Sequence, residues 1–295
     1  MTRPVALATC AETHAEADEA PLEDAFARAG VAYEWAVWDD AGVDWSRFAA
    51  VLIRTTWDYT DKIDAFRTWI DDVASVTRLW NPAPFVAWNS HKGYLVELGA
   101  RGVDVVPTTV VPVGTEPGPA SVPAGEPGDL IVKPAESAGS IGLTVWPAAG
   151  TNPTGALAAV AELHRAGQDA VVQPLLPQIR EGETSVMIID GEVTHAVRKV
   201  PAHGDIRSQP EWGADVARVE PTDAQVALGL AAIEATAVIV GRPADSLLYA
   251  RVDCVDREDR PRLIELELIE PDLYVGYDEH AADLLVAALG RRVGA

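Results

Sequence analysis

Residues 249–274, YARVDCVDREDRPRLIELELIEPDLY, give the strongest indication of the fold and chemistry of this chain. The pattern is typical of two short apolar strands joined by a charged turn at residues 256–262. Because successive strand side chains point to opposite faces, residues two apart share a face. Pairing of the strands is therefore expected to gather four charged side chains on one patch: Arg251, Asp253, Glu265 and Glu267.

The three acids of this patch are candidate metal ligands. Carboxylates this close repel one another unless a cation lies between them. Hard oxygen ligands suit Mg²⁺ better than Zn²⁺, so Asp253, Glu265 and Glu267 predict a magnesium site. A solvated, acid-rich sheet face fits the same pattern, and the hairpin alone leaves both interpretations open.

The composition limits the classes of partner. The chain has 295 residues, enough for two or three compact lobes, and a formal net charge of -22. Such an acidic surface argues against nucleic acid or an anionic membrane as the main partner. A local basic pocket could still bind an anionic ligand such as a nucleotide.

The cysteines and apolar segments indicate a cytoplasmic protein. Cys10 and Cys254 lie far apart, form no metal-spaced or redox pair, and are interpreted as small buried residues. The apolar run at the N-terminus is too short for a signal peptide. No segment is expected to reach the apolar length of a transmembrane helix.

The N-terminal part has the pattern of an open parallel α/β sheet. Strands are predicted at Val5–Thr9, Val31–Trp38 and Ala50–Arg54, with a helix at Glu19–Ala29 between the first two. The third strand is apolar enough to be buried on both faces. In such sheets ligands bind beyond the carboxyl ends of the strands.

The residues that follow the third strand are candidate substrate contacts. They are Arg54, Thr55, Trp57 and Asp58, in the sequence RTTWDY. A structural alternative is a surface ion pair between Arg54 and Asp58, with Trp57 filling the core.

The middle of the chain carries a candidate phosphate site. Lys133 lies on the apolar strand Leu130–Pro134, and a small-residue loop follows that strand. Small residues let backbone N–H groups approach phosphates, and the lysine could reach the same oxygens. The loop is not a Walker motif, and an ordinary turn fits it equally. Lys92 is predicted in the first turn of a helix at His91–Gly99.

Further strands and helices are predicted in the C-terminal half. Strands are expected at residues 170–173, 184–189 and 193–200, and helices at residues 223–240 and 281–289. The polar loop at residues 201–213 contains Arg207.

The order of these elements resembles the ATP-grasp ligase superfamily over most of the chain. The resemblance implies an α/β fold with an N-terminal open parallel domain (1–109), a central ATP-grasp lobe (110–176) and a C-terminal antiparallel-sheet domain (177–295). It also implies ATP as phosphoryl donor and Mg²⁺, with Mn²⁺ as a substitute. The expected partner is a small amino-acid-like substrate, and a homo-oligomer stays open.

The resemblance also implies roles for individual residues. Lys92 and Lys133 would hold ATP phosphates, and Lys199 and Arg251 would act in phosphoryl transfer. The flexible loop that closes over the phosphates would include Ser137, Gly139, Ser140 and Gly142. Gln173 and the backbone of Leu175 and Leu176 would contact adenine, and Glu183 the ribose. Arg207 would lie on the substrate side, and Asp253, Glu265 and Glu267 would bind the metal.

Two positions depart from the superfamily pattern. Glu267 stands where the family usually has Asn, which makes the metal site more negative, and Glu270 is left without an assigned role. Gln173 stands where an acid is common.

Three motifs are similar to the cyclo-ligase subgroup that forms D-cycloserine from O-ureido-D-serine: RTTWDY, NSHKGYL and ELELIEP. This similarity implies ring closure after carboxylate activation, with Asp58 and His195 as candidate general bases. An intermolecular carboxylate–amine ligase, a non-catalytic nucleotide-binding protein and an acidic protein with structural ion pairs are the alternatives.

Overall fold

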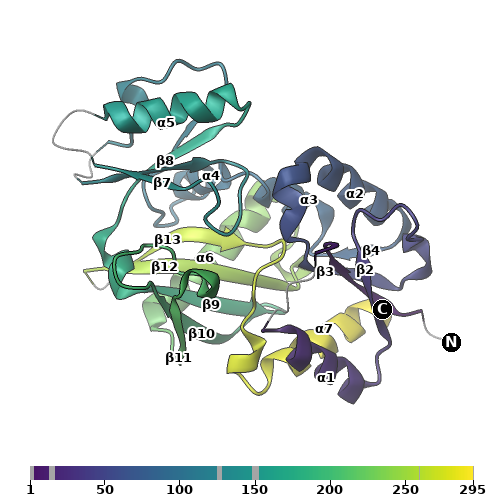
Figure 1. Ribbon diagram of the computed structural model, residues 1–295. Coiled ribbons are helices and arrows are strands. Elements are labelled where there is room, and N and C mark those ends of the chain that lie inside the picture. The colour runs from purple at the N-terminus through teal and green to yellow at the C-terminus, as the bar shows by residue number, and fades with distance from the viewer. Residues whose placement is uncertain (1–2, 13–16, 125–127, 148–152, 259, 295) are drawn as a thin grey trace.

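The computed structural model describes residues 3–12, 17–124, 128–147, 153–258 and 260–294. Within these residues the strands form one parallel and two antiparallel sheets (Figure 1). The predicted α/β class, with a parallel N-terminal sheet and an antiparallel C-terminal sheet, is confirmed.

The N-terminal sheet has the strand order β2-β1-β3-β4. Its strands are β1 (Val5–Thr9), β2 (Tyr33–Val37), β3 (Ala50–Thr55) and β4 (Arg78–Trp80). The helices around it are α1 (Glu19–Ala29), α2 (Ile63–Val76), α3 (Ala83–Asn89) and α7 (Ala281–Gly294). Alternate residues of β3 pack on opposite sides: Leu52 on the α1 and α7 side, Val51 and Ile53 on the α2 side. Every residue of β3 is buried, as its apolar sequence predicts.

A smaller antiparallel sheet forms the upper lobe in Figure 1. Its strands, in the order β5-β8-β6-β7, are β5 (Thr109–Val111), β8 (Ala170–Pro174), β6 (Leu130–Pro134) and β7 (Thr144–Trp146). Helix α5 (Thr154–Arg165) packs on this sheet through Ala156 and Val160. The arrangement leaves Lys133 on β6, the strand next to β8.

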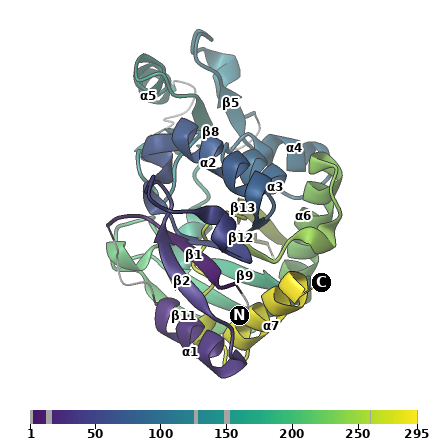
Figure 2. The same ribbon diagram turned by 90° about the vertical axis from the view of Figure 1, so that its right-hand side faces the viewer.

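The central sheet has the strand order β11-β10-β9-β12-β13. These are β11 (Asp215–Val219), β10 (Glu192–Val200), β9 (Glu183–Ile189), β12 (Tyr249–Arg257) and β13 (Arg260–Glu267). One face packs against α4 (Tyr94–Ala100) and α6 (Asp223–Val240), and the other against α7, as Figure 2 shows in part.

The β12–β13 hairpin has a shorter turn than the sequence predicts. Pairing continues through Asp256↔Pro261 to Arg257↔Arg260, where a turn was expected. Backbone hydrogen bonds hold the strands together whatever the charge of the side chains, so polar residues extend the ladder. Glu258, with φ 51°, begins the tight turn, and the neighbouring residue 259 lies outside the described residues.

Helix α6 corrects the expectation that no segment has the length and hydropathy of a membrane span. It has 18 residues with a mean hydropathy of 1.6. Leu228, Ala232 and Ile233 pack into the cluster that covers the central sheet. A core helix passes the same test of length and composition, so this single helix is weak evidence for a membrane.

Asn81 joins the N-terminal sheet to the central sheet. Its side-chain amide donates hydrogen bonds to the carbonyls of Tyr249 (2.9 Å) and Leu268 (2.8 Å). Its Oδ1 accepts from the backbone N–H of Leu248 at 2.8 Å. Asn81 is completely buried, so water does not replace these bonds.

We predict that Asn81→Ala lowers the free energy of unfolding by about 3 kcal/mol, because it leaves buried backbone groups without partners. Denaturant unfolding of the variant measures the loss. The exposed Gln168→Ala serves as the control, with an expected change near zero. A loss from Asn81→Ala below about 1 kcal/mol would contradict this account of the junction.

Candidate active site

The predicted carboxylate patch forms on the hairpin. The register pairs Arg251 with Glu267 and Asp253 with Glu265, so all four residues share one face of the sheet. One carboxylate oxygen from each of Asp253, Glu265 and Glu267 lies within 4.8 Å of the others. The prediction that the hairpin gathers these side chains is confirmed.

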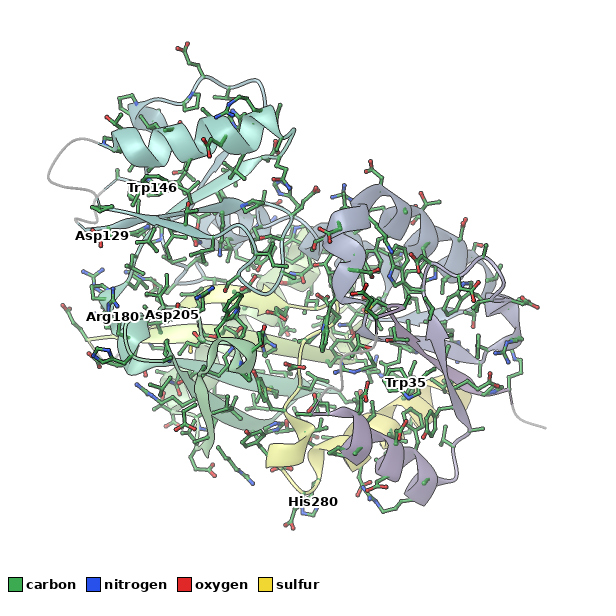
Figure 3. All side chains as sticks on the ribbon, in the orientation of Figure 1. Trp35, Asp129, Trp146, Arg180, Asp205 and His280 are labelled. Atoms are coloured by element: carbon green, nitrogen blue, oxygen red, sulfur yellow. The ribbon has the colours of Figure 1, made fainter. Side chains whose placement is uncertain are left out.

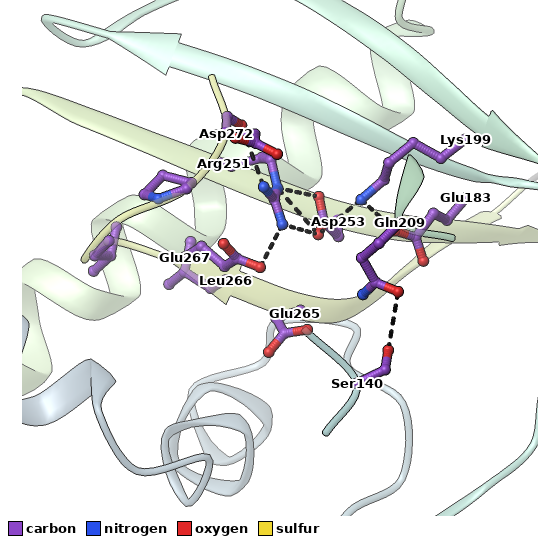
Figure 4. Close-up of polar contacts among 12 residues, drawn as sticks. Ser140, Glu183, Lys199, Gln209, Arg251, Asp253, Glu265, Leu266, Glu267 and Asp272 are labelled. Carbon is purple, nitrogen blue, oxygen red and sulfur yellow. Dashed lines mark hydrogen bonds and ion pairs between the residues drawn. The ribbon is translucent and has the colours of Figure 1, made fainter. Parts of the chain in front are cut away.

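Arg251 crosses the patch and pairs with two of its acids. Its Nε lies 3.1 Å from Asp253 Oδ1, and its Nη2 pairs with Glu267 (Figure 4). Its Nη1 also donates to the carbonyl of Asp272 at 3.2 Å. Arg251 is 8% exposed, so these contacts are largely shielded from water.

Lys199 lies beside the patch, on β10 and on the same face of the central sheet. Its Nζ pairs with Glu183 and lies 3.4 Å from Asp253 Oδ2. With 2% exposure, Lys199 is buried between these two acids and does not line the neighbouring cleft.

Burial and neighbouring charges divide the acids into two groups. Burial tends to raise the pKa of Asp253, but Arg251 and Lys199 outweigh it and hold the pKa at about 2. Burial also raises the pKa of Glu267, to about 7. The neighbouring Arg251 opposes this shift, and the charge of Glu265 adds to it. Asp253 is thus firmly ionised, whereas Glu267 keeps its proton more readily until a cation arrives.

Lys92 and Lys133 face the same patch from the opposite side. Lys92 Nζ lies 3.1 Å from Glu265 Oε1 and donates to the carbonyl of Ser137. It lies just before α4, not in its first turn as predicted, because its backbone N–H instead bonds to the carbonyl of Ala135 at 2.8 Å. Within the described residues, the Lys133 ammonium forms no ion pair, and burial lowers its pKa.

The loop between β6 and β7 bends over these lysines. A small cavity is lined by Lys92, Lys133, Glu265 and loop residues 137–141. Gly142 has φ 74°, and an added Cβ would lie 2.9 Å from the Pro134 ring, so only glycine fits there. Ser140 Oγ donates to Gln209 Oε1 at 3.1 Å, joining the loop to residues 201–213 (Figure 4).

A cleft lined by both apolar and polar side chains includes Arg251, Asp253 and Glu265 of the charged patch. Its apolar walls come from both antiparallel sheets and the segments that join them: Val106, Ile131, Leu175, Leu176, Ile179, Val255 and Ile264. Gln173 and Glu183 also line it. The combination of an apolar slot and a charged end suits a planar base joined to phosphates.

The backbone at Leu175 and Leu176 provides one open donor and one open acceptor. Leu175 N–H donates to the carbonyl of Asp129 at 2.7 Å, and Leu176 C=O accepts from Ile179 at 3.1 Å. In the part of the chain that the structure describes, Leu175 C=O and Leu176 N–H make no hydrogen bond. Gln173 Nε2 is held by Thr108 Oγ1 at 2.9 Å.

Comparison with known proteins identifies the family. Residues 5–81 match the model of the D-cycloserine synthetase DcsG N-terminal domain, and residues 103–242 that of the prokaryotic glutathione synthetase ATP-grasp domain. The chain is 33% identical over 285 residues to the cycloserine biosynthesis protein DcsG of Streptomyces lavendulae, covering 94% of each chain. The chain belongs to the ATP-grasp ligase family. It is an ATP-dependent carbon–nitrogen ligase.

Solved structures agree with this assignment. The crystal structure of D-cycloserine synthetase DcsG superposes with a TM-score of 0.86 at 30% identity, covering 98% of this chain and 99% of that one. The D-alanine–D-alanine ligase of Bacillus anthracis, complexed with ATP, has a TM-score of 0.66 at 11% identity, with 99% and 97% coverage. The second likeness shows the ATP-grasp fold alone.

The predicted substrate-side residues of this ATP-grasp chain lie at the carboxyl edge of the parallel sheet. Arg54 is 1% exposed; it donates to the carbonyl of Pro271 at 3.0 Å and lies 3.6 Å from Asp18. It therefore holds the loop after β13, and its contact with substrate stays a prediction. Thr55 is also buried, bonded to Thr9.

Asp58 and Trp57 begin the short helix η2 (Trp57–Lys62). Asp58 accepts from Trp38 and Lys62, each at 2.7 Å, so the predicted alternative pairing with Arg54 is wrong. These two bonds leave Asp58 poorly placed to take a proton from a substrate. Contact of Thr55 and Trp57 with substrate stays a prediction.

Arg207 and His195 have local partners in the ATP-grasp structure. Arg207 pairs with Asp205 at 2.6 Å and stacks on Trp212, 3.6 Å from the ring centroid. Figure 3 labels Asp205 on the loop after β10, below the lobe that carries Asp129. His195 is 2% exposed, and its Nε2 lies 3.0 Å from the carbonyls of Leu273 and Tyr274, so it supports that loop.

Several functional-looking contacts have no clear signal in the sequence. Gln209 and Ser208 line the cleft, and Gln209 holds Ser140, yet both come from a loop with no motif. Asn89 bonds to the backbone of Leu266 and Leu268 on the hairpin, at 2.9 Å in each case. Its place in NSHKGYL, close to Lys92, is the one signal that could have indicated a role.

We predict that Lys133→Ala weakens binding of an ATP analogue by about 10- to 100-fold, because a charge-assisted bond to phosphate is lost. Isothermal titration calorimetry with Mg²⁺ present measures the affinity. Lys62→Ala is the matched control, because Lys62 pairs with Asp39 and Asp58 away from the cleft. Unchanged affinity of Lys133→Ala would contradict the assignment.

Proposed function

We propose that this ligase is a cyclo-ligase that converts O-ureido-D-serine to D-cycloserine at the expense of ATP. The observation that carries the proposal is the patch of three carboxylates opposite Lys92 and Lys133, at one end of a cleft that also has apolar walls. Similarity over nearly the whole chain to a cycloserine biosynthesis protein supports this choice of substrate.

The residues present fit Mg²⁺ and ATP. Asp253, Glu265 and Glu267 offer hard oxygen ligands close enough to share one ion. When bound, Mg²⁺ supplies charge neutralisation at the phosphate oxygens, and Mn²⁺ is expected to replace it. Lys92 and Lys133 would hold phosphates, with the loop of Ser137, Gly139, Ser140 and Gly142 over them.

The part of the cleft with apolar walls would hold the nucleoside. The open C=O of Leu175 and N–H of Leu176 form a donor–acceptor pair that suits the edge of adenine. Glu183 lines the same cleft and would contact the ribose. We also propose that the functional units are 1–109 for substrate, 110–176 for the lobe over ATP, and 177–295 for the metal.

Activation of the substrate carboxylate is the first chemical step. A carboxylate resists nucleophiles because its charge repels them and oxide is a poor leaving group. Transfer of the γ-phosphoryl group to a carboxylate oxygen gives an acyl phosphate and ADP. Arg251, held by Asp253 and Glu267, is placed to offset the charge that develops during this transfer. Lys199 would act through Asp253, which it supports.

Ring closure follows within the same molecule. The nitrogen on the side-chain oxygen attacks the acyl carbon, forms the C–N bond and expels phosphate. Holding both groups in one folded substrate raises their effective concentration strongly. Hydrolysis of the carbamoyl group then consumes water and releases CO₂ and ammonia, which balances the conversion to D-cycloserine.

We predict that the enzyme releases ADP and phosphate with O-ureido-D-serine alone, without an added amine, and forms D-cycloserine in equal amount. Coupled ADP detection and mass spectrometry measure both products. ADP release only after addition of a second amine would reject cyclisation and favour an intermolecular ligase. No ADP release with any carboxylate would favour a non-catalytic nucleotide-binding protein.

Glu265→Gln provides the matched variant for this assay. It keeps the shape of the side chain but removes one metal ligand charge, so turnover should fall by at least about 100-fold. The melting temperature should change little, because among the described residues the ion pair of Glu265 is with Lys92 alone. Turnover equal to that of the unmodified enzyme would reject the metal assignment.

A further inference from the structure

Glu270 is a buried acid that the functions described above do not use. It lies three residues beyond Glu267 and is 8% exposed. Within the described residues its carboxylate makes no ion pair with Lys, Arg or His and no hydrogen bond to another side chain. It also lies outside the group of Asp253, Glu265 and Glu267, whose oxygens converge. An ionised carboxylate that is buried without a cationic partner is costly, so Glu270 favours its neutral form until a cation lies beside it.

The backbone around Glu270 is fixed by buried side chains. On one side, the Tyr249 hydroxyl donates to the carbonyl of Ile269 at 2.6 Å. On the other, Arg54 Nη2 donates to the carbonyl of Pro271 at 3.0 Å. The position of Glu270 is therefore built by the junction of the N-terminal and central sheets, as a binding residue requires.

The surroundings of Glu270 place it beside the activation site. After burial, its carboxylate charge is the largest influence that raises the pKa of the buried Tyr59 phenol, on η2. Burial raises the pKa of Glu270 to about 8, and the negative charge of Glu267 is the second cause. The positive charges of Lys92 and Arg251 act on Glu270 in the opposite direction. The side chain thus lies between the carboxyl edge of the parallel sheet and the hairpin patch.

We propose that Glu270 binds the α-ammonium group of the substrate and selects amino acids over other carboxylic acids. The inference rests on the proposed function, because it requires a substrate carboxylate at the hairpin patch. In an α-amino acid the ammonium group is one carbon away from the carboxylate. An acid that recognises it must therefore lie close to the hairpin patch, and Glu270 is three residues beyond Glu267 in the segment that joins the hairpin to the parallel sheet.

An ammonium group of the substrate would also supply the positive charge that Glu270 lacks. Arg251 is already shared between Asp253 and Glu267, and Lys92 lies against Glu265. An incoming ammonium would add one positive charge beside Glu270 and Glu267, and a charge-assisted hydrogen bond in this buried setting is strong. A carboxylic acid without the amino group would leave Glu270 unpaired, and the site would reject it.

The test compares Glu270→Gln with the unmodified enzyme on two substrates. These are O-ureido-D-serine and 3-(ureidooxy)propanoic acid, which lacks only the amino group. Hydroxylamine added with MgATP traps the acyl phosphate as a hydroxamate, so activation is measured whether or not a ring closes. Glu279→Gln, whose side chain is 84% exposed, is the matched control. Thermal stabilisation by MgATP checks that each variant still binds nucleotide.

We expect the unmodified enzyme to favour the amino substrate by about 100-fold in kcat/KM, as a lost buried charge pair implies. In Glu270→Gln, kcat/KM for the amino substrate should fall by a similar factor, mainly through KM, while that for the other acid changes little. An equal loss of kcat/KM on both substrates in Glu270→Gln would overturn the proposal. So would loss of stabilisation by MgATP, which would make Glu270 part of the nucleotide or metal site.

The outcome separates this inference from the proposed function. Hydroxamate without D-cycloserine would reject cyclisation, while the comparison of the two substrates would still decide the role of Glu270. If neither ureido compound is activated, the same comparison is made with D-alanine and D-lactate. If Glu270→Gln leaves the ratio of kcat/KM for D-alanine to that for D-lactate unchanged, the proposal is overturned.

Discussion

The structure depends on the convergence of three carboxylates on one hairpin face. Asp253, Glu265 and Glu267 have oxygens within 4.8 Å in a chain of net charge -22, so their mutual repulsion must be offset locally. Arg251 crosses between two of them, and Lys199 lies beside Asp253 on the same face. A register slip of one residue would send these side chains to opposite faces. The hairpin register is thus the condition for the whole site.

The segment after β13 connects this patch to the parallel sheet. Arg54 holds the carbonyl of Pro271, while Asp18 accepts from the N–H groups of Leu273 (2.6 Å) and Val275 (2.8 Å). His195 holds the same loop from the central sheet. These contacts are buried, so they hold the parallel sheet firmly against the hairpin. The lobe formed by β5, β6, β7 and β8 contacts the rest of the protein partly through polar side chains. Lys92 bonds to Ser137 in its loop, and Ser140 in the same loop bonds to Gln209.

Much of the fold could be predicted because apolar periodicity is local. The parallel sheet, the hairpin patch and the strand that carries Lys133 follow from alternation and buried runs. The short strands β4, β5 and β11 could not be predicted, because partners from elsewhere in the chain stabilise them. The burial of Arg54 and the support of Asp253 by Lys199 depend on contacts between segments far apart in sequence, which one-dimensional patterns do not reveal. For the same reason Glu270 had no assigned role until its surroundings were known.

The central claim is that the hairpin acids hold the metal that serves the phosphoryl group. The most direct measurement is a crystal structure with ADP and Mn²⁺, with the ion located by anomalous scattering. The account predicts a peak bound by oxygens of Asp253, Glu265 and Glu267, at about 2.0–2.6 Å as for hard cations on carboxylates. A peak away from these three residues, or no peak in a crystal with ordered ADP, would contradict it.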